Sequence, residues 1–333
     1  MDHRSTKGQS NDQTDGLVEI FDERKLSQAI KKGKQKSLRK TIFVSLLVAV
    51  LMFILLNIGN MTLTTMMGNK ANQRMSAYIE LTVPNGYIST SIDNIGFLGG
   101  RSDYTISRII NNKPVILENR MYPFGILPQI TMSRHQGGAG HIAGEWPTSY
   151  WDYGYGKMMF FHPEITYKEY KNDLAELNQI ANDKVIELGL SLDKSYTIAE
   201  VSELLPDLNI SWYWINAFKA EDIDRYKQNA IKYDAKATYI PEYETLGVSM
   251  RAITKAEYFP FEYNDFLFNL KISQNPRFLE IYNDLDANGY IDPAKVPILG
   301  VIVYGTKDQL ASLTENPHIK ASSFGVIVDK YGM

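Results

Sequence analysis

Residues 41–58 read TIFVSLLVAVLMFILLNI, and no charged residue occurs from position 41 to position 69. As a helix, residues 42–58 would extend about 25 Å, and a few uncharged flanking residues bring this to the roughly 30 Å hydrocarbon thickness of a bilayer. A helix buried in a soluble core normally interleaves polar positions, whereas only Ser45 and Asn57 interrupt this run. The stretch therefore predicts a single transmembrane helix over residues 41–59.

Positive charges lie on one side of this helix. Residues 31–40, KKGKQKSLRK, hold six positive charges and no acid, whereas the first positive charges beyond the apolar run are Lys70 and Arg74. Basic flanks stay in the cytoplasm, so we expect a cytoplasmic tail over residues 1–40 and an extracytoplasmic region over 60–333. No A-x-A-like cleavage site follows the run, which favours an uncleaved anchor in the cell membrane over a signal peptide.

The overall charge balance conceals an asymmetry. The 333-residue chain has a net charge of −3, but residues 1–40 carry ten Lys/Arg against six Asp/Glu, so the remainder is acidic. An acidic outer region is a poor partner for nucleic acid, and we expect no direct nucleic-acid binding. The chain has no cysteine, so the outer region must be held by an ordinary hydrophobic core rather than by disulfides.

The tail contains apolar side chains that a simple anchor does not need. Residues 1–16 are polar and are expected to be disordered. The next residues supply two apolar groups, the second with helical spacing, so we predict a docking segment within 17–36 that contacts a partner through Leu17, Val18, Ile20, Phe21, Leu26 and Ile30. The alternative is a solvated juxtamembrane helix whose lysines touch anionic lipid headgroups, which explains the lysines but not the apolar groups.

Residues 60–161 predict a β-rich membrane-proximal region. A polar spacer is expected over 60–74, followed by strands at 78–83 and 87–92 joined at Asn85-Gly86, a turn pair that tolerates positive φ. A further strand is predicted at 113–119.

Residues 162–333 predict an α+β domain. A capping box at Thr166–Glu169 predicts a helix that ends at Gly189, and a second box at Thr197 predicts a short helix closed by Pro206. The alternation around Trp212 and Trp214 predicts a strand covered by a partner layer. Residues 219–245 are charged and are expected to form an irregular surface excursion.

The last third of the chain predicts helices around 266–270 and from Asn275-Pro276, and then a strand–helix–strand unit. The strands are expected at 296–304 and 322–329, with a third capping box at Thr306 between them. This order predicts a βαβ crossover with a parallel pair of strands. The fold class is therefore an α+β outer region on one transmembrane helix with a short cytoplasmic tail.

Motifs for chemistry are weak. The series Asp284, Asp286, Asn288 and Asp292 resembles the start of a calcium-binding loop, but Lys295 stands where a bidentate carboxylate is needed, so a turn is the better interpretation. Three histidines, His135, His141 and His162, match no zinc pattern. Nucleophile and phosphate-binding motifs are absent from the sequence. We expect no enzyme, no catalytic residues, no metal and no cofactor.

The order of segments carries a family resemblance. Residues 21–37, FDERKLSQAIKKGKQKS, run into the apolar stretch and resemble the N-terminal region of the sigma factor regulator family of Gram-positive bacteria. The phrases LPDLNISWY at 205–213, VIVYGTKDQL at 301–310 and NPHIKASSFGV at 316–326 resemble the C-terminal domain of the same family. The resemblance brings no catalytic residues with it.

The resemblance implies a membrane-bound anti-sigma factor that holds an extracytoplasmic-function (ECF) sigma factor inactive and responds to cell envelope stress. Its partners would be that sigma factor, the lipid bilayer and another membrane protein. A short amphipathic segment can mask a groove that the sigma factor otherwise presents to RNA polymerase. Two alternatives stay open, a membrane-anchored envelope-binding or structural module without a sigma partner, and a cell-wall enzyme with a pocket around His135 and His141.

Overall fold

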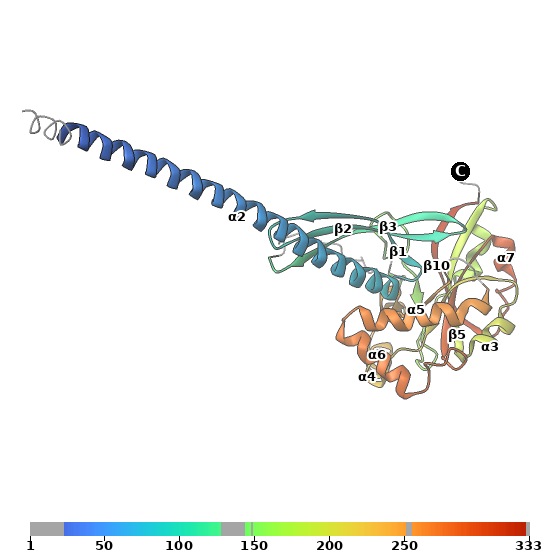
Figure 1. Ribbon diagram of the computed structural model, residues 1–333. Helices are drawn as coiled ribbons and strands as arrows, with labels where there is room; N and C mark the ends of the chain where they lie inside the picture. The colour runs from blue at the N-terminus through green and yellow to red at the C-terminus, as the bar shows by residue number, and fades with distance from the viewer. Residues whose placement is uncertain (1–22, 128–143, 148, 251–254, 331–333) are drawn as a thin grey trace, which may run out of the picture. The chain divides into compact units, whose positions relative to one another are not determined.

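The computed structural model describes residues 23–127, 144–147, 149–250 and 255–330 (Figure 1). Two compact units divide the chain, an N-terminal unit of residues 1–62 and a C-terminal unit of residues 63–333. The first described element, helix α2 (Glu23–Thr82), begins in the N-terminal unit and ends in the C-terminal unit. The predicted polar spacer over 60–74 is therefore wrong, because these residues continue the helix.

The apolar run is solvent-exposed along its whole length. Within α2, none of the most hydrophobic 18-residue window is buried inside the protein, and this is one helix long and apolar enough to cross a membrane. Phe43 and Phe53 expose 67% and 68% of their surface. A helix of this kind is therefore not a core helix of the described structure, in agreement with the interpretation from sequence.

The C-terminal end of α2 occupies residues predicted to be a strand. Residues 78–82 are helical instead, because this last part packs between two cores: Leu81 lies in one hydrophobic cluster and Ile79 in another. Asn85 then adopts a positive φ of 56°, as the predicted turn requires.

An antiparallel three-stranded sheet follows the turn, in the order β1-β2-β3. Its strands are β1 (Gly86–Ile95), β2 (Gly99–Ile110) and β3 (Lys113–Gly125). The strands predicted at 87–92 and 113–119 are confirmed, and both are longer than predicted.

A five-stranded sheet forms the centre of the C-terminal unit, in the order β10-β5-β9-β6-β8. Its strands are β5 (Lys184–Tyr196), β6 (Asn209–Ile215), β8 (Gly247–Ser249), β9 (Ile298–Gly305) and β10 (Ile319–Asp329). Every pairing is antiparallel. Helix α7 (Lys307–Ala311) joins β9 to β10 behind the predicted capping box at Thr306. Both strands run antiparallel to β5 and are therefore parallel to each other, as predicted. Their predicted pairing is wrong, because β5 lies between them.

Helices and short elements cover the sheet. They are η1 (Asp173–Gln179), α3 (Ile198–Leu204), α4 (Ala220–Lys232), α5 (Phe259–Ile272) and α6 (Pro276–Ala287), with β4 (Met159–Phe160) paired to β7 (Ile240–Pro241), and the single turns η2 (Ala235–Ala237), η3 (Glu242–Glu244) and η4 (Ala256–Tyr258). The boxes at Thr197 and Thr306 and the Asn275 cap are confirmed.

Two predictions in this region are wrong. Of the helix predicted from Thr166 to Gly189, only the 3-10 helix η1 (Asp173–Gln179) is present, and Gly189 lies inside strand β5. The irregular excursion over 219–245 contains α4, whose buried Ile223, Tyr226 and Ala230 recur at helical spacing.

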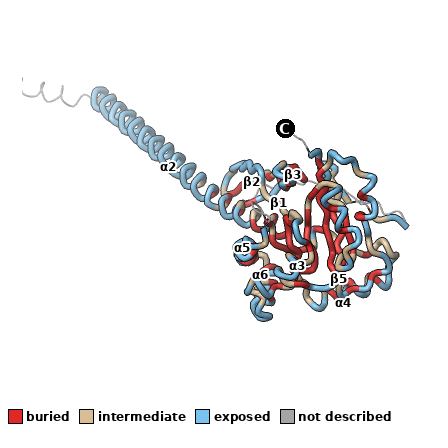
Figure 2. The backbone as a smooth tube through the Cα atoms, turned by 90° about the vertical axis from the view of Figure 1, so that its right-hand side faces the viewer, coloured by how far each residue is buried: buried red, intermediate tan, exposed pale blue. Residues whose placement is uncertain are grey.

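Both faces of the five-stranded sheet are covered, and buried residues concentrate there (Figure 2). Tyr213 and Ile215 face a core that includes residues of α5 and α6. Trp212 and Trp214 face a second core, in which the Phe160 ring lies 5.3 Å from the Trp214 ring. The covering layer predicted from the two indoles is therefore present.

Candidate functional site

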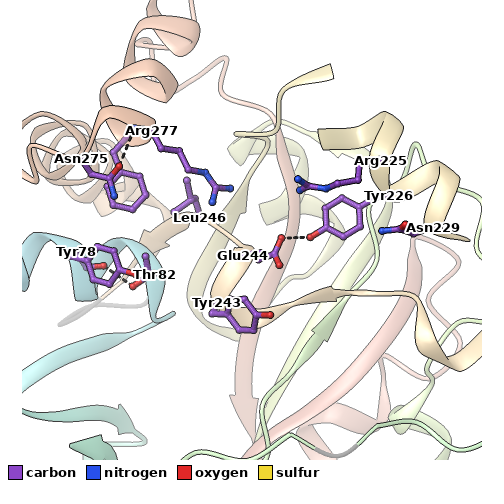
Figure 3. A pocket seen from close by; sticks show the side chains of 11 residues that line it. Tyr78, Thr82, Arg225, Tyr226, Asn229, Tyr243, Glu244, Leu246, Asn275 and Arg277 are labelled. Carbon is purple, nitrogen blue, oxygen red and sulfur yellow. Dashed lines mark hydrogen bonds between the residues drawn. The ribbon is translucent and has the colours of Figure 1, made fainter. Parts of the chain in front are cut away.

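A cavity of about 490 Å³ opens where four parts of the C-terminal unit meet (Figure 3). Four elements form its walls: the C-terminal end of α2, helix α4, η3 together with Leu246 just before β8, and the N-terminal end of α6. The lining residues are Tyr78, Thr82, Arg225, Tyr226, Asn229, Tyr243, Glu244, Leu246, Asn275, Arg277 and Phe278. This size falls in the range of small-molecule sites, and the lining is more polar than that of a typical drug-sized pocket.

The polar groups of the cavity come from opposite walls. Arg225 of α4 and Arg277 of α6 extend toward each other across the space (Figure 3). Arg225 pairs with Asp222 at 2.9 Å, whereas Arg277 forms no ion pair with a residue that the structure describes. Two guanidinium groups in this arrangement favour an acidic or hydrogen-bond-accepting ligand.

Tyr226 and Glu244 define the floor between the two arginines. The Tyr226 hydroxyl donates a hydrogen bond to the Glu244 carboxylate, and the Arg225 guanidinium lies 5.4 Å from the Tyr226 ring centre. Burial, reinforced by the bond to Glu244, raises the pKa of Tyr226. The phenol therefore stays protonated at physiological pH and acts as a donor.

The end of α2 is a structural wall of the cavity. The Tyr78 ring lies 6.0 Å from the Phe278 ring of α6. The neighbouring Glu80 accepts a hydrogen bond of 2.6 Å from Asn269 of α5. Just past the helix, the Asn85 side chain donates to Ser211 of β6 at 2.8 Å. A ligand in the cavity would therefore contact a helix end that is bonded to both α5 and the sheet.

A buried ion cluster lies elsewhere in the same unit. Arg108 of β2 donates to Glu187 of β5 at 2.7 Å and to Glu242 of η3. Burial lowers the pKa of Arg108, but the two carboxylates more than offset this and raise it overall. Burial also raises the pKa of Glu187. All three side chains are buried and paired with one another, so we interpret the cluster as a structural joint rather than as a reactive site.

Of the predicted partner-binding residues, Leu17, Val18, Ile20 and Phe21 lie outside the described residues. Leu26 and Ile30 lie one turn apart on α2 in the N-terminal unit. They expose 55% and 51% of their surface. These two side chains are therefore free to meet a partner.

The weak chemical candidates take ordinary structural places. Asp284 and Asp286 lie in the last turn of α6, and the Asn288 backbone bonds to the Asp284 carbonyl at 3.1 Å, so the acidic series forms a helix end and turn. His135 and His141 lie outside the described residues. His162 is fully buried, and burial lowers its pKa. Within the described part of the chain, no group of three or more potential metal ligands occurs.

Sequence reasoning missed both the cavity and the ion cluster. Arg108 stands 79 residues from Glu187 and 134 from Glu242, so no local pattern joins them. For the cavity one signal was available, because the helical spacing of Ile223, Tyr226 and Ala230 would have placed Arg225 on α4.

Two family models match the chain. The model described as sigma factor regulator N-terminal matches residues 27–115, and the one described as sigma factor regulator C-terminal matches residues 177–326. No curated protein and no solved structure matches. The first match covers most of α2 and the strands β1 and β2, and the second covers most of the five-stranded sheet.

Proposed function

The chain belongs to the sigma factor regulator family, and from this we propose that it is a single-pass membrane anti-sigma factor that sequesters an ECF-type sigma factor through its cytoplasmic tail. The N-terminal family match begins at residue 27 and continues past the apolar run. The match thus includes part of the tail, the helix that would cross the membrane and the strands β1 and β2, as a regulator that joins two compartments would need.

The observation that carries this proposal is the exposure of apolar side chains on the tail. Leu26 and Ile30 belong to a helix that buries neither of them in the described structure. Burying a Leu or Ile side chain contributes about 1.5–3 kcal/mol. A partner that covers this helix face would gain that contribution at each position, and a groove on a sigma factor that normally binds a polymerase helix is such a partner.

We place regulation in the C-terminal unit, outside the membrane. The cavity of Figure 3 includes the end of α2, the helix that also holds the tail contacts. A ligand that binds one arrangement of this helix end better than another shifts the balance between them, and by linkage the sigma factor alters ligand affinity by the same factor. A ligand or a substitution that favours one arrangement of the cavity would therefore change how tightly the tail holds the sigma factor.

Co-purification from membranes tests the proposal directly. The full chain with a tag after Met333 is solubilised and captured, and the bound proteins are identified by mass spectrometry. We expect an ECF-type sigma factor to be recovered. A deletion of residues 1–16 serves as the matched control and should retain it, whereas a deletion of residues 17–30 should lose it while the protein stays in the membrane.

Recovery of lipid without a sigma factor from the full chain would contradict the proposal. It would favour a membrane-anchored envelope-binding or structural module. Equal recovery with both deletions would show that the sigma factor binds somewhere other than the tail segment.

A further inference from the structure

An apolar, uncharged tip ends the three-stranded sheet. The hairpin tip consists of Ile95, Phe97, Ile126 and Leu127, which expose 45%, 67%, 61% and 56% of their surface. Phe97 lies in the turn between β1 and β2, and Ile126 and Leu127 follow β3. The backbone amides of Ile126 and Leu127 both donate to the Leu98 carbonyl, at 2.8 and 3.1 Å, so the four side chains belong to one edge.

The hairpin tip has no charge of its own. Residues 94–100 and 121–127 contain no Asp, Glu, Lys or Arg. The charges that directly flank these stretches are Asp93, Arg101 and Arg120, and each has a partner away from the tip. Asp93 accepts a hydrogen bond from Asn72 at 3.1 Å, Arg101 pairs with Asp103 at 2.9 Å, and Arg120 pairs with Glu118 at 2.5 Å. Isolated apolar side chains on a surface need no explanation, but four adjacent ones without an intervening charge mark an interaction surface.

Strand β1 runs back along α2 and sets the position of the tip within the C-terminal unit (Figure 1). Two contacts set its register against α2. Asn72 donates to Asp93 at 3.1 Å, and a Cβ on Gly68 would lie 3.3 Å from the Phe124 ring. Phe124 lies opposite Gly100, and Gly100 lies opposite Ile95. The end of β1 is therefore level with Gly68, and the tip lies near the start of the part of α2 that belongs to this unit.

Chain length ties those residues to the apolar run. Leu63, the first residue of the C-terminal unit, comes five positions after Ile58, the last residue of the run. Five residues extend at most about 18 Å even when fully stretched, and about 8 Å as helix. If residues 41–59 cross a bilayer, the start of this unit cannot lie far from the headgroup layer.

We infer that the hairpin tip inserts into the interfacial layer of the outer leaflet, so that the bilayer is its partner. The inference rests on the membrane span of the proposed function. Apolar and aromatic side chains gain free energy at this depth, where charged ones lose it. The outer unit then contacts the membrane at a second point besides α2, and the strands fix its orientation over the bilayer.

The chain offers a clean test because it contains no cysteine. Single-cysteine variants of the full chain are labelled with an environment-sensitive fluorophore and reconstituted into phosphatidylcholine–phosphatidylglycerol vesicles. Lipids brominated near the headgroup or deep in the acyl chain are then compared as quenchers. Phe97→Cys and Leu127→Cys report from the tip. Phe53→Cys reports from the span, and Ile231→Cys, at 76% exposure on α4, is the matched exposed apolar control.

We expect both tip labels to show blue-shifted emission and at least twofold stronger quenching by shallow than by deep bromolipids. The α4 label should remain water-exposed and unquenched. Tip labels that behave like the α4 label while the span label is quenched would overturn the inference and leave the proposed function intact. Blue-shifted but unquenched tip labels would show a protein partner or a second copy instead, which also overturns it. An unquenched span label would refute the membrane span and, with it, this inference.

Discussion

Arg108 of β2 and Glu187 of β5 form a 2.7 Å ion pair from which solvent is excluded, with side-chain exposures of 0% and 2%. Glu242 contacts the same guanidinium. The Glu187 carboxylate also accepts the Val326 amide at 3.1 Å, and that of Glu242 accepts the Met158 amide at 2.8 Å. One cation thus joins the three-stranded sheet to the five-stranded sheet and to the loop before β8.

Replacing Arg108 with Met should destabilise the C-terminal unit strongly. The change leaves two buried carboxylates without a cation, and removing one partner of a buried pair typically costs about 3–5 kcal/mol. Arg101→Met is the matched control on the same strand. Its pair with Asp103 is partly exposed, so its loss should cost less than about 1 kcal/mol. Denaturant unfolding in detergent, followed by tryptophan fluorescence, measures the free energy of unfolding of both variants. Equal losses of stability would show that the Arg108 cluster does not hold the two sheets together.

Acidification should destabilise the unit through His162. Burial lowers its pKa, so the folded state binds fewer protons than the unfolded state, whose histidine titrates near 6.5. The contribution of His162 to stability is present above that value and is lost as pH falls below it. The Glu164 amide donates to Nδ1 at 3.2 Å, a bond that protonation at that nitrogen would remove.

The matched variant is His162→Phe, because an aromatic ring retains the edge contacts with Trp214 and Phe218. The melting temperature is measured between pH 5 and pH 7.5. The variant should lose less stability than the wild type between pH 6.5 and pH 5. Parallel curves would show that His162 does not titrate in this range.

The tail contacts should be apolar rather than electrostatic. Replacing Phe21 and Leu26 with Asp removes two apolar side chains that the sigma factor is proposed to bury. Burial of each would contribute about 1.5–3 kcal/mol, so the double change should weaken sigma-factor binding at least tenfold. Reporter transcription from a promoter of that sigma factor should rise, with the protein still in the membrane. Changing Lys31, Lys32 and Lys34 to Gln should alter mainly insertion or lipid contact. If the lysine changes raise transcription and the apolar changes do not, the interface is electrostatic.

The topology should follow the six positive charges of residues 31–40. A tag before Met1 should be protected from protease in intact protoplasts, and a tag after Met333 should be digested. Permeabilised protoplasts, in which both tags are digested, provide the control. The reverse pattern would refute both the cytoplasmic tail and sequestration of a sigma factor by it.

The cavity should influence sequestration without contributing to folding. Arg277→Glu reverses the charge on one wall of the cavity. The Arg277 side chain is exposed and forms no ion pair with a described residue, so the change should leave folding unaffected. We expect altered reporter transcription at an unchanged melting temperature. Lys232→Glu, an exposed change on α4 outside the cavity, should leave transcription unchanged. Equal effects of the two variants would remove the cavity from the regulatory proposal.

The sequence predicts elements best where a local signal agrees with the tertiary environment. Thr197 and Thr306 cap real helices because each is followed by a residue at the third helical position that bonds back to its amide. Thr166–Glu169 has the same spacing but caps no helix. Tyr167 and Tyr170 pack instead against the Phe161 ring, at 5.0 and 5.6 Å, and this aromatic contact holds the segment out of a helix.

Two other errors have the same physical origin. The β-branched and aromatic residues of 78–83 favour a strand. Helix α2 nevertheless continues through Thr82, because as a helix this segment buries Ile79 and Leu81. The sequence predicts the strands β9 and β10 themselves, but their place in the sheet depends on β5, which lies more than a hundred residues before β9 in the chain. Local sequence contains no information on such a partner.

The position of β5 between β10 and β9 also affects how the molecule reaches its folded state. Lys184, at the start of β5, contacts Asp329, at the end of β10, 145 positions later. Non-local pairings of this kind form slowly, because a long loop must close before any contact rewards it. The chain therefore cannot complete this sheet until residues 319–329 are available. A chain cut before β10 would keep an open β5 edge and a Glu187 without its Val326 amide. The docking of β10 is therefore the step that commits the C-terminal unit to its native state.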